Sequence, residues 1–310
     1  MTKARECLID LAVTPYYHCC TRTVRRAFLT GKDKATGKNF GYRRQWIQDR
    51  FFLLSQVFAI DICSYAIMSN HYHLVLHVDR ERALRWSTIE VIRRWTKLFK
   101  GPKLIQSYLH SPEQLSDGQT FVVQELAKIW RERLYDISWF MKCLNEYIAR
   151  KANREDGCTG HFWESRFKSQ ALLDEQALYS CMTYVDLNPI RAGITDSLET
   201  SEFTSIKERL RHYRQPTLRK NLRLSAFKGQ NNSSHILNMH PEDYFALVDF
   251  TGRHQDPRKR GFIPDNEPKI LDKLAMAPST WLQWSQAFEH QFSSFAGVGI
   301  LKQPMQQTTV

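Results

Sequence analysis

Alternating apolar and polar positions around residues 66–76 predict a β-strand. The side chains in and beside this stretch include several that favour a pleated surface: Tyr65, Ile67, Tyr72, Val75 and Val78. Residues two apart in a strand point to the same face, so His71 and His73 are expected to project side by side. Tyr72 and Leu74 then point to the opposite face.

Apolar residues at helical spacing predict three helices around this strand. Residues 43–60 form the first, and its apolar face is expected to pack on the sheet through Ile47, Phe51, Leu54 and Phe58. Residues 137–154 form the second. The third is expected from about Asp174, a suitable N-cap, to Leu187, because Pro189 stops the helix.

Other segments give coarser predictions. Residues 8–23 look extended, with an interruption expected at Pro15. Residues 80–135 are charged and helical in pattern, and they look like an insertion. Residues 205–228 are the most basic run of the chain, and residues 240–296 appear mainly helical.

The composition adds a strong positive charge to this picture. The 310-residue chain has a formal net charge of +12 and an isoelectric point near 9.4. Such a surplus fits a polyanionic partner, most simply nucleic acid, although an ordinary basic protein is an alternative. The seven cysteines include no Cys-x-x-Cys pair, so reduced thiols in a cytoplasmic protein are expected. No apolar stretch is long enough to predict a membrane span.

The two strand histidines are the first candidate chemistry. Imidazoles at this spacing can hold one metal ion or one phosphate oxygen between them. With no other signal beside it, however, a His-x-His sequence in a strand is often only two surface or hydrogen-bonded histidines. His77 lies farther along the strand, roughly 13 Å from His73 at the usual rise per residue, and is left out of the site. His18 is a further candidate for the site, although a structural role is commoner for such a histidine.

Three segments together resemble one family. They are Asn70 to Leu74 (Asn-His-Tyr-His-Leu), Gly160 to Lys168 (Gly-His-Phe-Trp-Glu-Ser-Arg-Phe-Lys), and Tyr184 to Gly193 (Tyr-Val-Asp-Leu-Asn-Pro-Ile-Arg-Ala-Gly). In this order they are similar to motifs of the IS200-like single-tyrosine (HUH) transposases, most closely the branch associated with repeated extragenic palindromes (REP). The resemblance covers roughly residues 5–200.

The resemblance implies a site and a reaction. Tyr184 would be the nucleophile, and a divalent ion, Mg²⁺ or Mn²⁺, would be held by His71, His73 and Asn188. Single-stranded DNA beside a hairpin would be cleaved and rejoined through a 5′-phosphotyrosine intermediate. Three basic residues would contact the DNA: Arg166, Lys168 and Arg191. Tyr184 and Asn188 are four apart, hence on one helix face. Asp186 is a competing ligand that should point off this face, and Tyr147 is the rival nucleophile.

The expected fold class is α+β. The resemblance implies a ferredoxin-like antiparallel sheet with packed helices, in a nuclease domain at residues 1–200 with the helical insertion at about 80–135. A basic linker at 201–235 and a helical C-terminal domain at 236–310 would follow. The protein is expected to be a monomer or homodimer in the bacterial cytoplasm, associated with the nucleoid. The alternatives are a catalytically silent protein that binds DNA hairpins and, less favoured by the charge, a metal-dependent hydrolase of small substrates.

Overall fold

The computed structural model describes residues 9–24, 30–31, 37–215, 222–230, 235–254, 277–286, 288, 292 and 295–297. The chain divides into two compact units. Unit 1 takes the described residues of 1–45, 62–77 and 162–310, and unit 2 takes 46–61 and 78–161.

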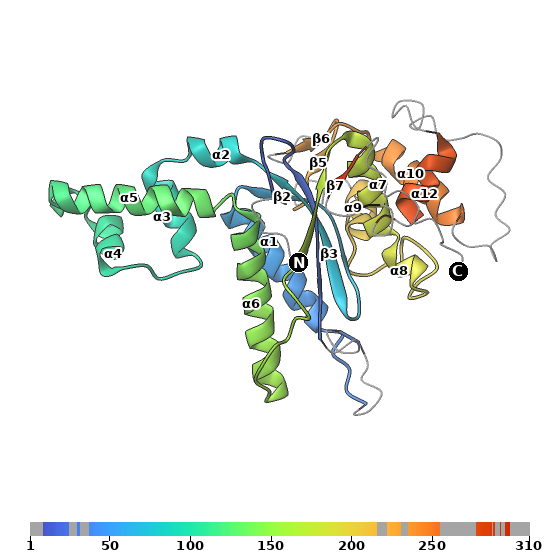
Figure 1. The fold of residues 1–310 in the computed structure, drawn as a ribbon, viewed down its shortest axis with the longest axis horizontal. Coiled ribbons are helices and arrows are strands. Elements are labelled where there is room, and N and C mark those ends of the chain that lie inside the picture. The colour runs from blue at the N-terminus through green and yellow to red at the C-terminus, as the bar shows by residue number, and fades with distance from the viewer. Residues whose placement is uncertain are drawn as a thin grey trace, which may run out of the picture. The chain divides into compact units, whose positions relative to one another are not determined.

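A five-stranded sheet is the centre of unit 1 (Figure 1). Its strands are β1 (Tyr16–Arg22), β2 (Ile60–Ile67), β3 (His71–Val78), β4 (Lys168–Leu172) and β7 (Phe295–Ala296). The order is β2-β3-β1-β4-β7, and β1 is antiparallel to both β3 and β4. The α+β class is therefore confirmed. The expectation of a wholly antiparallel sheet is wrong at one edge, because β7 pairs in parallel with β4.

The strand predicted over residues 66–76 is divided by a turn. β2 ends at Ile67 and β3 begins at His71, and the amide of Met68 donates to the carbonyl of His71 at 2.8 Å. Ser69 and Asn70 are residue types that favour turns over strands, and they lie between the two strands. The alternation of faces within β3 is the predicted one, since Tyr72 is buried on the face opposite to the histidines.

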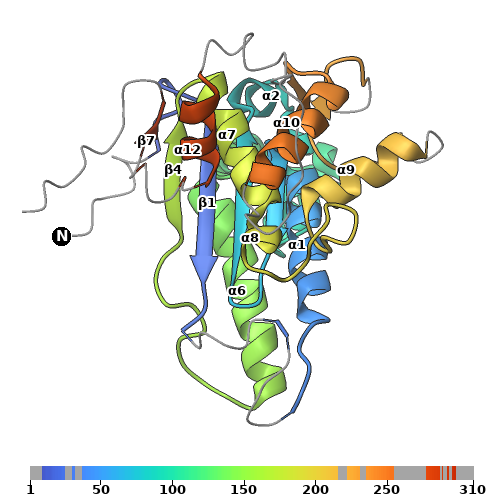
Figure 2. The same cartoon turned by 90° about the vertical axis from the view of Figure 1, so that its right-hand side faces the viewer.

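Helices of unit 1 lie together on one side of the sheet (Figure 2). They are α7 (Glu175–Asp186), α8 (Asn188–Arg191), α9 (Ser205–Arg214), α10 (Pro241–His254) and α12 (Pro278–Gln286). The predicted N-cap is confirmed, because the Asp174 carboxylate accepts from the amide of Ala177 at 2.7 Å. The predicted end is confirmed as well, because α7 ends at Asp186 with Leu187 as its C-cap. A separate short helix, α8, begins at Asn188, and Pro189 lies in its first turn, where a backbone N–H would have no helical hydrogen bond to make.

The described C-terminal residues share the core of unit 1. Tyr244 of α10, Trp281 and Trp284 of α12 and Phe288 are buried with Met182 of α7. The short strands β5 (Ala226–Phe227) and β6 (Ile236–Leu237) pair beside this core. The predicted domain boundaries near residues 200 and 235 stay a prediction. Part of the basic linker, at 216–221 and 231–234, and much of the C-terminal domain lie outside the described residues.

Unit 2 is helical apart from the ends of two strands. It contains most of α1 (Arg43–Val57), then α2 (Arg80–Arg85), α3 (Thr88–Thr96), α4 (Lys103–His110), a 3₁₀ turn (Pro112–Gln114), α5 (Asp117–Arg133) and α6 (Ile137–Asp156). The predicted helical character of residues 80–135 is confirmed. Helix α1 ends three residues before the predicted 60, where β2 begins.

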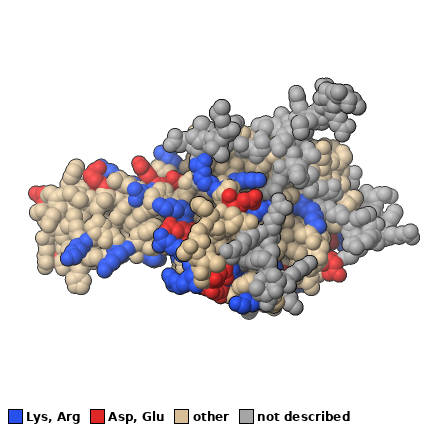
Figure 3. Space-filling model, turned by 60° about the horizontal axis from the view of Figure 1, so that its bottom comes forward, with Lys and Arg blue, Asp and Glu red and all other residues tan. Residues whose placement is uncertain are grey.

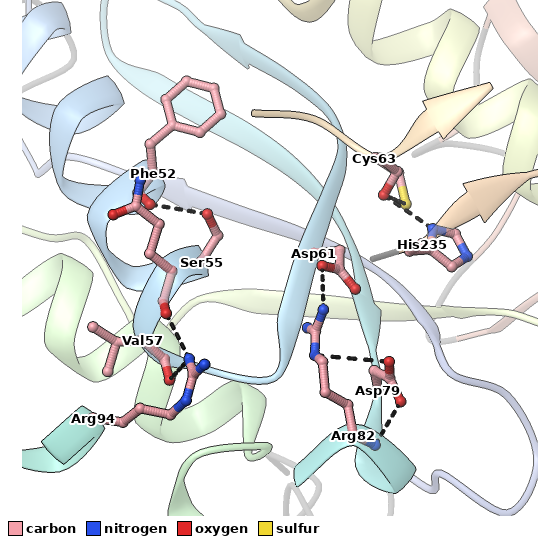
Figure 4. A network of polar contacts seen from close by, with 11 residues as sticks. Phe52, Ser55, Val57, Asp61, Cys63, Asp79, Arg82, Arg94 and His235 are labelled. Atoms are coloured by element: carbon pink, nitrogen blue, oxygen red, sulfur yellow. Dashed lines mark hydrogen bonds and ion pairs between the residues drawn. The ribbon is translucent and has the colours of Figure 1, made fainter. Parts of the chain in front are cut away.

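Two arginines join the elements of unit 2 (Figure 4). Arg82 donates to the Asp61 carboxylate at 2.9 Å, and its amide donates to the Asp79 carboxylate that caps α2. Arg94 of α3 donates to the carbonyls of Gln56 and Val57 at the C-terminal end of α1. The Arg82 amide and the carbonyls of Gln56 and Val57 are helix-end groups, and these bonds give them partners outside their own helices.

Asp186, at the end of α7, is the buried polar centre of unit 1. Its carboxylate accepts from the Tyr244 hydroxyl at 2.6 Å, from the amide of Ile206 at 3.0 Å and from the Ser205 hydroxyl. Burial raises its pKa from 3.8 to about 6, although these hydrogen bonds act in the opposite direction. As expected, Asp186 points off the face that carries Tyr184.

The buried carboxyl predicts a pH-dependent stability. Native Asp186 holds its proton up to about pH 6, whereas the unfolded chain releases it near pH 4. The contribution of this group to the unfolding free energy is therefore expected to fall by up to about 3 kcal/mol as pH rises from about 4 to about 6. Urea unfolding of wild type and Asp186→Asn across this range measures it, since the variant lacks the titrating group. Glu113→Gln, which removes an exposed carboxylate, is the charge-matched control. Equal pH dependence in wild type and Asp186→Asn would contradict the prediction.

Candidate functional site

The two strand histidines lie together at the start of β3. Their ring centroids are 4.9 Å apart and the rings are nearly perpendicular, at 86°. His73 is buried, whereas His71 is partly exposed and its Nδ1 lies 2.6 Å from the Asn70 amide oxygen. The pair therefore presents one buried imidazole and one partly exposed imidazole at the first residue of β3.

Helix α7 brings the predicted nucleophile to these histidines. The ring of Tyr184 lies edge-on to His73, with centroids 5.7 Å apart. Asn188, the first residue of α8, places its side-chain nitrogen 3.3 Å from His73 Nε2. Tyr184 and Asn188 thus approach the same imidazole from a segment that lies more than 100 residues further along the chain.

Burial keeps His73 neutral. Its pKa is lowered well below 6.5, first by burial and then by the neighbouring His71 and His18. The neutral imidazole is the form that binds a metal, because one of its ring nitrogens has a free lone pair. The electrostatics of this residue therefore suit a ligand role.

Asn188 and His73 are close enough together to be neighbouring ligands of one ion. Two neighbouring ligands of an octahedral ion at about 2.1 Å lie roughly 3 Å apart, and the Asn188 amide is 3.3 Å from His73 Nε2. Asn188 presents its nitrogen to His73 here, so ligation through oxygen requires the amide to turn over. Within the described part of the chain, no group of three or more His, Cys, Asp or Glu is placed to hold a metal. The expected set of His71, His73 and Asn188 stays a prediction.

Arg191 packs directly on the predicted nucleophile. Its guanidinium carbon lies 4.1 Å from the centre of the Tyr184 ring. One end of the guanidinium donates to the Ser285 carbonyl at 2.7 Å, and the other end donates to the carbonyl of Tyr184 itself. Arg191 therefore joins α7, α8 and α12, and its predicted contact with DNA stays a prediction.

The other two predicted DNA-contacting residues precede or begin β4. Arg166 and Lys168 are exposed, and Phe167 between them is buried. Cys20 of β1 pairs with both His73 and Lys168, and directly opposed residues point to the same face of a sheet. Lys168 is therefore on the site's face of the sheet.

Arg22 and Gln170 also lie on this face of the sheet, and the sequence did not predict either of them. His18, which the sequence left undecided, lies there too. Arg22 is exposed and pairs with His71 across β1 and β3. His18 is buried on the same face, with its Nε2 3.0 Å from His73 Nδ1, and its Nδ1 is 2.7 Å from the Gln170 side-chain oxygen. The position of Gln170 depends on the register of β4, which leaves no local signal in the sequence.

Comparisons with known proteins give limited information. No known protein-family profile matches the chain, and no curated protein sequence matches it. A solved structure described as the REP-associated tyrosine transposase bound to a REP hairpin is similar with a TM-score of 0.38 and 10% sequence identity. The match covers 64% of this chain and 81% of that chain. This likeness is distant, and it assigns no function. None of the described helices is long and apolar enough to cross a membrane.

Because Arg191 donates to two backbone carbonyls, we expect Arg191→Lys to lower the stability of the fold. Arg191→Lys keeps the charge but replaces a planar fork with a single ammonium, which cannot span both carbonyls. The unfolding free energy is expected to fall by roughly 1–2 kcal/mol in urea unfolding. Arg166→Lys, at an exposed position, is the matched control and should change it by less than about 0.5 kcal/mol. Equal effects of the two substitutions would contradict the assigned contacts.

Proposed function

We propose that this chain is a metal-dependent DNA nuclease and strand transferase that acts on single-stranded DNA beside hairpins. The observation that carries the proposal is the meeting of Tyr184, His73 and Asn188 at one imidazole. A phenol beside a neutral histidine and a carboxamide combines a nucleophile with candidate metal ligands. The motif resemblance that runs through residues 70–74, 160–168 and 184–193 supports the same reaction.

The chemistry is a transesterification. The Tyr184 oxygen attacks the scissile phosphorus and loses its proton, while the bond to the 3′ oxygen breaks and that oxygen leaves as a 3′-OH. A divalent ion, Mg²⁺ or Mn²⁺, polarises the phosphate when it is bound and offsets the negative charge that develops. His71, His73 and Asn188 would hold it. Attack by a 3′-OH on the 5′-phosphotyrosine restores a phosphodiester, so joining needs no ATP.

Cations around the site support a polyanionic substrate. Arg22 and Lys168 lie on the sheet face that carries His73, and Arg191 places a guanidinium beside Tyr184. On the face drawn in Figure 3, the described Lys and Arg residues are mixed with Asp and Glu. The net charge of +12 therefore favours DNA in general, and the local cations favour the phosphate at the site.

Several finer features belong to the same proposal. The strand order β2-β3-β1-β4 supports a ferredoxin-like arrangement, to which β7 is an addition. Arg166 and Lys168 would contact the DNA backbone near the cleaved bond. The protein would act as a monomer or homodimer in the bacterial cytoplasm.

Covalent adduct formation tests the proposal. The purified protein is incubated with labelled single-stranded hairpin oligonucleotides and Mg²⁺ or Mn²⁺, and the products are separated on a denaturing gel. We expect a metal-dependent protein–DNA band that is absent in Tyr184→Phe and reduced at least about 100-fold in His71→Ala. Tyr147→Phe removes an exposed tyrosine of unit 2 and is the matched control, which should keep the band.

Two results would overturn the assignment. An adduct retained in Tyr184→Phe but lost in Tyr147→Phe would move the nucleophile to Tyr147. Tight hairpin binding with no adduct on any oligonucleotide would favour the catalytically silent binding protein. The silent binding protein stays a candidate because Asn188 directs its amide nitrogen, which is not a metal ligand, toward His73.

A further inference from the structure

Three neighbouring strands place a row of polar side chains behind the metal-ligand candidates. β1 lies between β3 and β4, and His18 of β1 is directly opposite Gln170 of β4. On the other side His18 pairs with Val75, two residues beyond His73 on the same face of β3. His18 can therefore contact His73 on one side and Gln170 on the other.

A backbone carbonyl at one end determines the direction of every hydrogen bond in this row. The carbonyl oxygen of Phe292 can only accept, so the Gln170 amide nitrogen, 3.1 Å away, donates to it. The Gln170 oxygen then faces His18 Nδ1 at 2.7 Å and accepts its proton. A neutral His18 protonated on Nδ1 has its lone pair on Nε2.

The same reasoning continues to the site. His18 Nε2 accepts from His73 Nδ1 at 3.0 Å, so the proton of His73 is on Nδ1 and its lone pair is on Nε2. The Asn188 amide nitrogen, 3.3 Å from His73 Nε2, is placed to donate to that lone pair. The hydrogen bonds are mutually consistent from Phe292 to Asn188.

We propose that His18 and Gln170 are positioning residues that hold His73 in the tautomer with its Nε2 lone pair directed to the site. The inference rests on the proposed function for the use made of that lone pair, which is binding of the divalent ion. Histidine ligands commonly donate their second ring proton to an outer acceptor, and this contact orients the ring and selects the tautomer. Here the outer acceptor is another histidine, held in turn by a glutamine.

Burial makes the row effective. The exposed fractions of His73, His18 and Gln170 are 1%, 2% and 8%. Water therefore has little access to replace a lost partner, and a change at Gln170 is expected to pass to His18 and then to His73. Through its carbonyl, Phe292 of the C-terminal part of unit 1 also belongs to this row of hydrogen bonds.

The tautomer of His73 can be measured directly. Long-range ¹H–¹⁵N NMR spectra of the metal-free, ¹⁵N-histidine-labelled full chain distinguish a protonated ring nitrogen from an unprotonated one, and His73→Gln assigns the signals. The wild type is expected to show His73 protonated on Nδ1. In Gln170→Leu, which removes the acceptor of His18, we expect a shift toward Nε2 protonation and Mn²⁺ affinity 10- to 100-fold weaker by calorimetry.

Two further variants separate positioning from general damage. Gln170→Glu places a carboxyl at this buried position, where burial favours its neutral form. A neutral carboxyl can accept from His18 and donate to the Phe292 carbonyl, so this variant should keep the wild-type tautomer and a Mn²⁺ affinity within about threefold of wild type. His77→Gln changes a histidine of the same strand face that stacks on His235, 3.7 Å between ring centroids, outside the row. It should leave both the His73 tautomer and the Mn²⁺ affinity unchanged.

The outcomes distinguish this inference from the proposed function. Wild-type His73 protonated on Nε2, or a Gln170→Leu spectrum identical to wild type, would overturn the positioning role whether or not Mn²⁺ binds. Unchanged Mn²⁺ affinity in His71→Ala and His73→Gln would overturn the metal site. In that case the expected tautomer in the wild type would still support the hydrogen-bonded row.

Discussion

The pairing of β1 with both β3 and β4 is the constraint on which the rest of the structure depends. Residues of β1 are opposite His71 and His73 on one side and opposite Lys168 and Gln170 on the other. A slip of one residue in either pairing would turn a whole strand's side chains to the wrong face. The register therefore decides which polar groups surround the histidines, and the apolar side chains of the opposite face, such as Tyr72 and Leu74, hold it through burial.

The rotation of α7 about its own axis is the second constraint, and it is set by burial. Asp186 turns inward to hydrogen bonds from Tyr244 and Ser205, while Tyr184 two residues earlier faces His73. Residues two apart on a helix point in widely different directions, so anchoring one determines the other. The cost of burying a carboxyl is thus linked to the placement of the candidate nucleophile.

The C-terminal segment contributes to the site without supplying obvious chemistry. The Phe288 ring lies 6.0 Å from the rings of both His18 and Tyr184. Backbone carbonyls of Ser285 and Phe292 accept from Arg191 and Gln170. Backbone carbonyls are present at every residue, so no side-chain pattern distinguishes the ones that perform this task. This is why the sequence gives no sign that Ser285 and Phe292 contact residues of the site.

While the α+β class was expected from the family resemblance, the sequence by itself determined that the two histidines share one strand face and that Tyr184 and Asn188 are four residues apart. These are local properties, because strand and helix periods fix which neighbours share a face. Tertiary structure alone decided that β7 adds a parallel edge, that Arg191 donates to the Ser285 carbonyl, and that His18 contacts both His73 and Gln170. Each of these depends on a pairing between segments about 50 to 150 residues apart, and such a register is selected by the packing of the whole core.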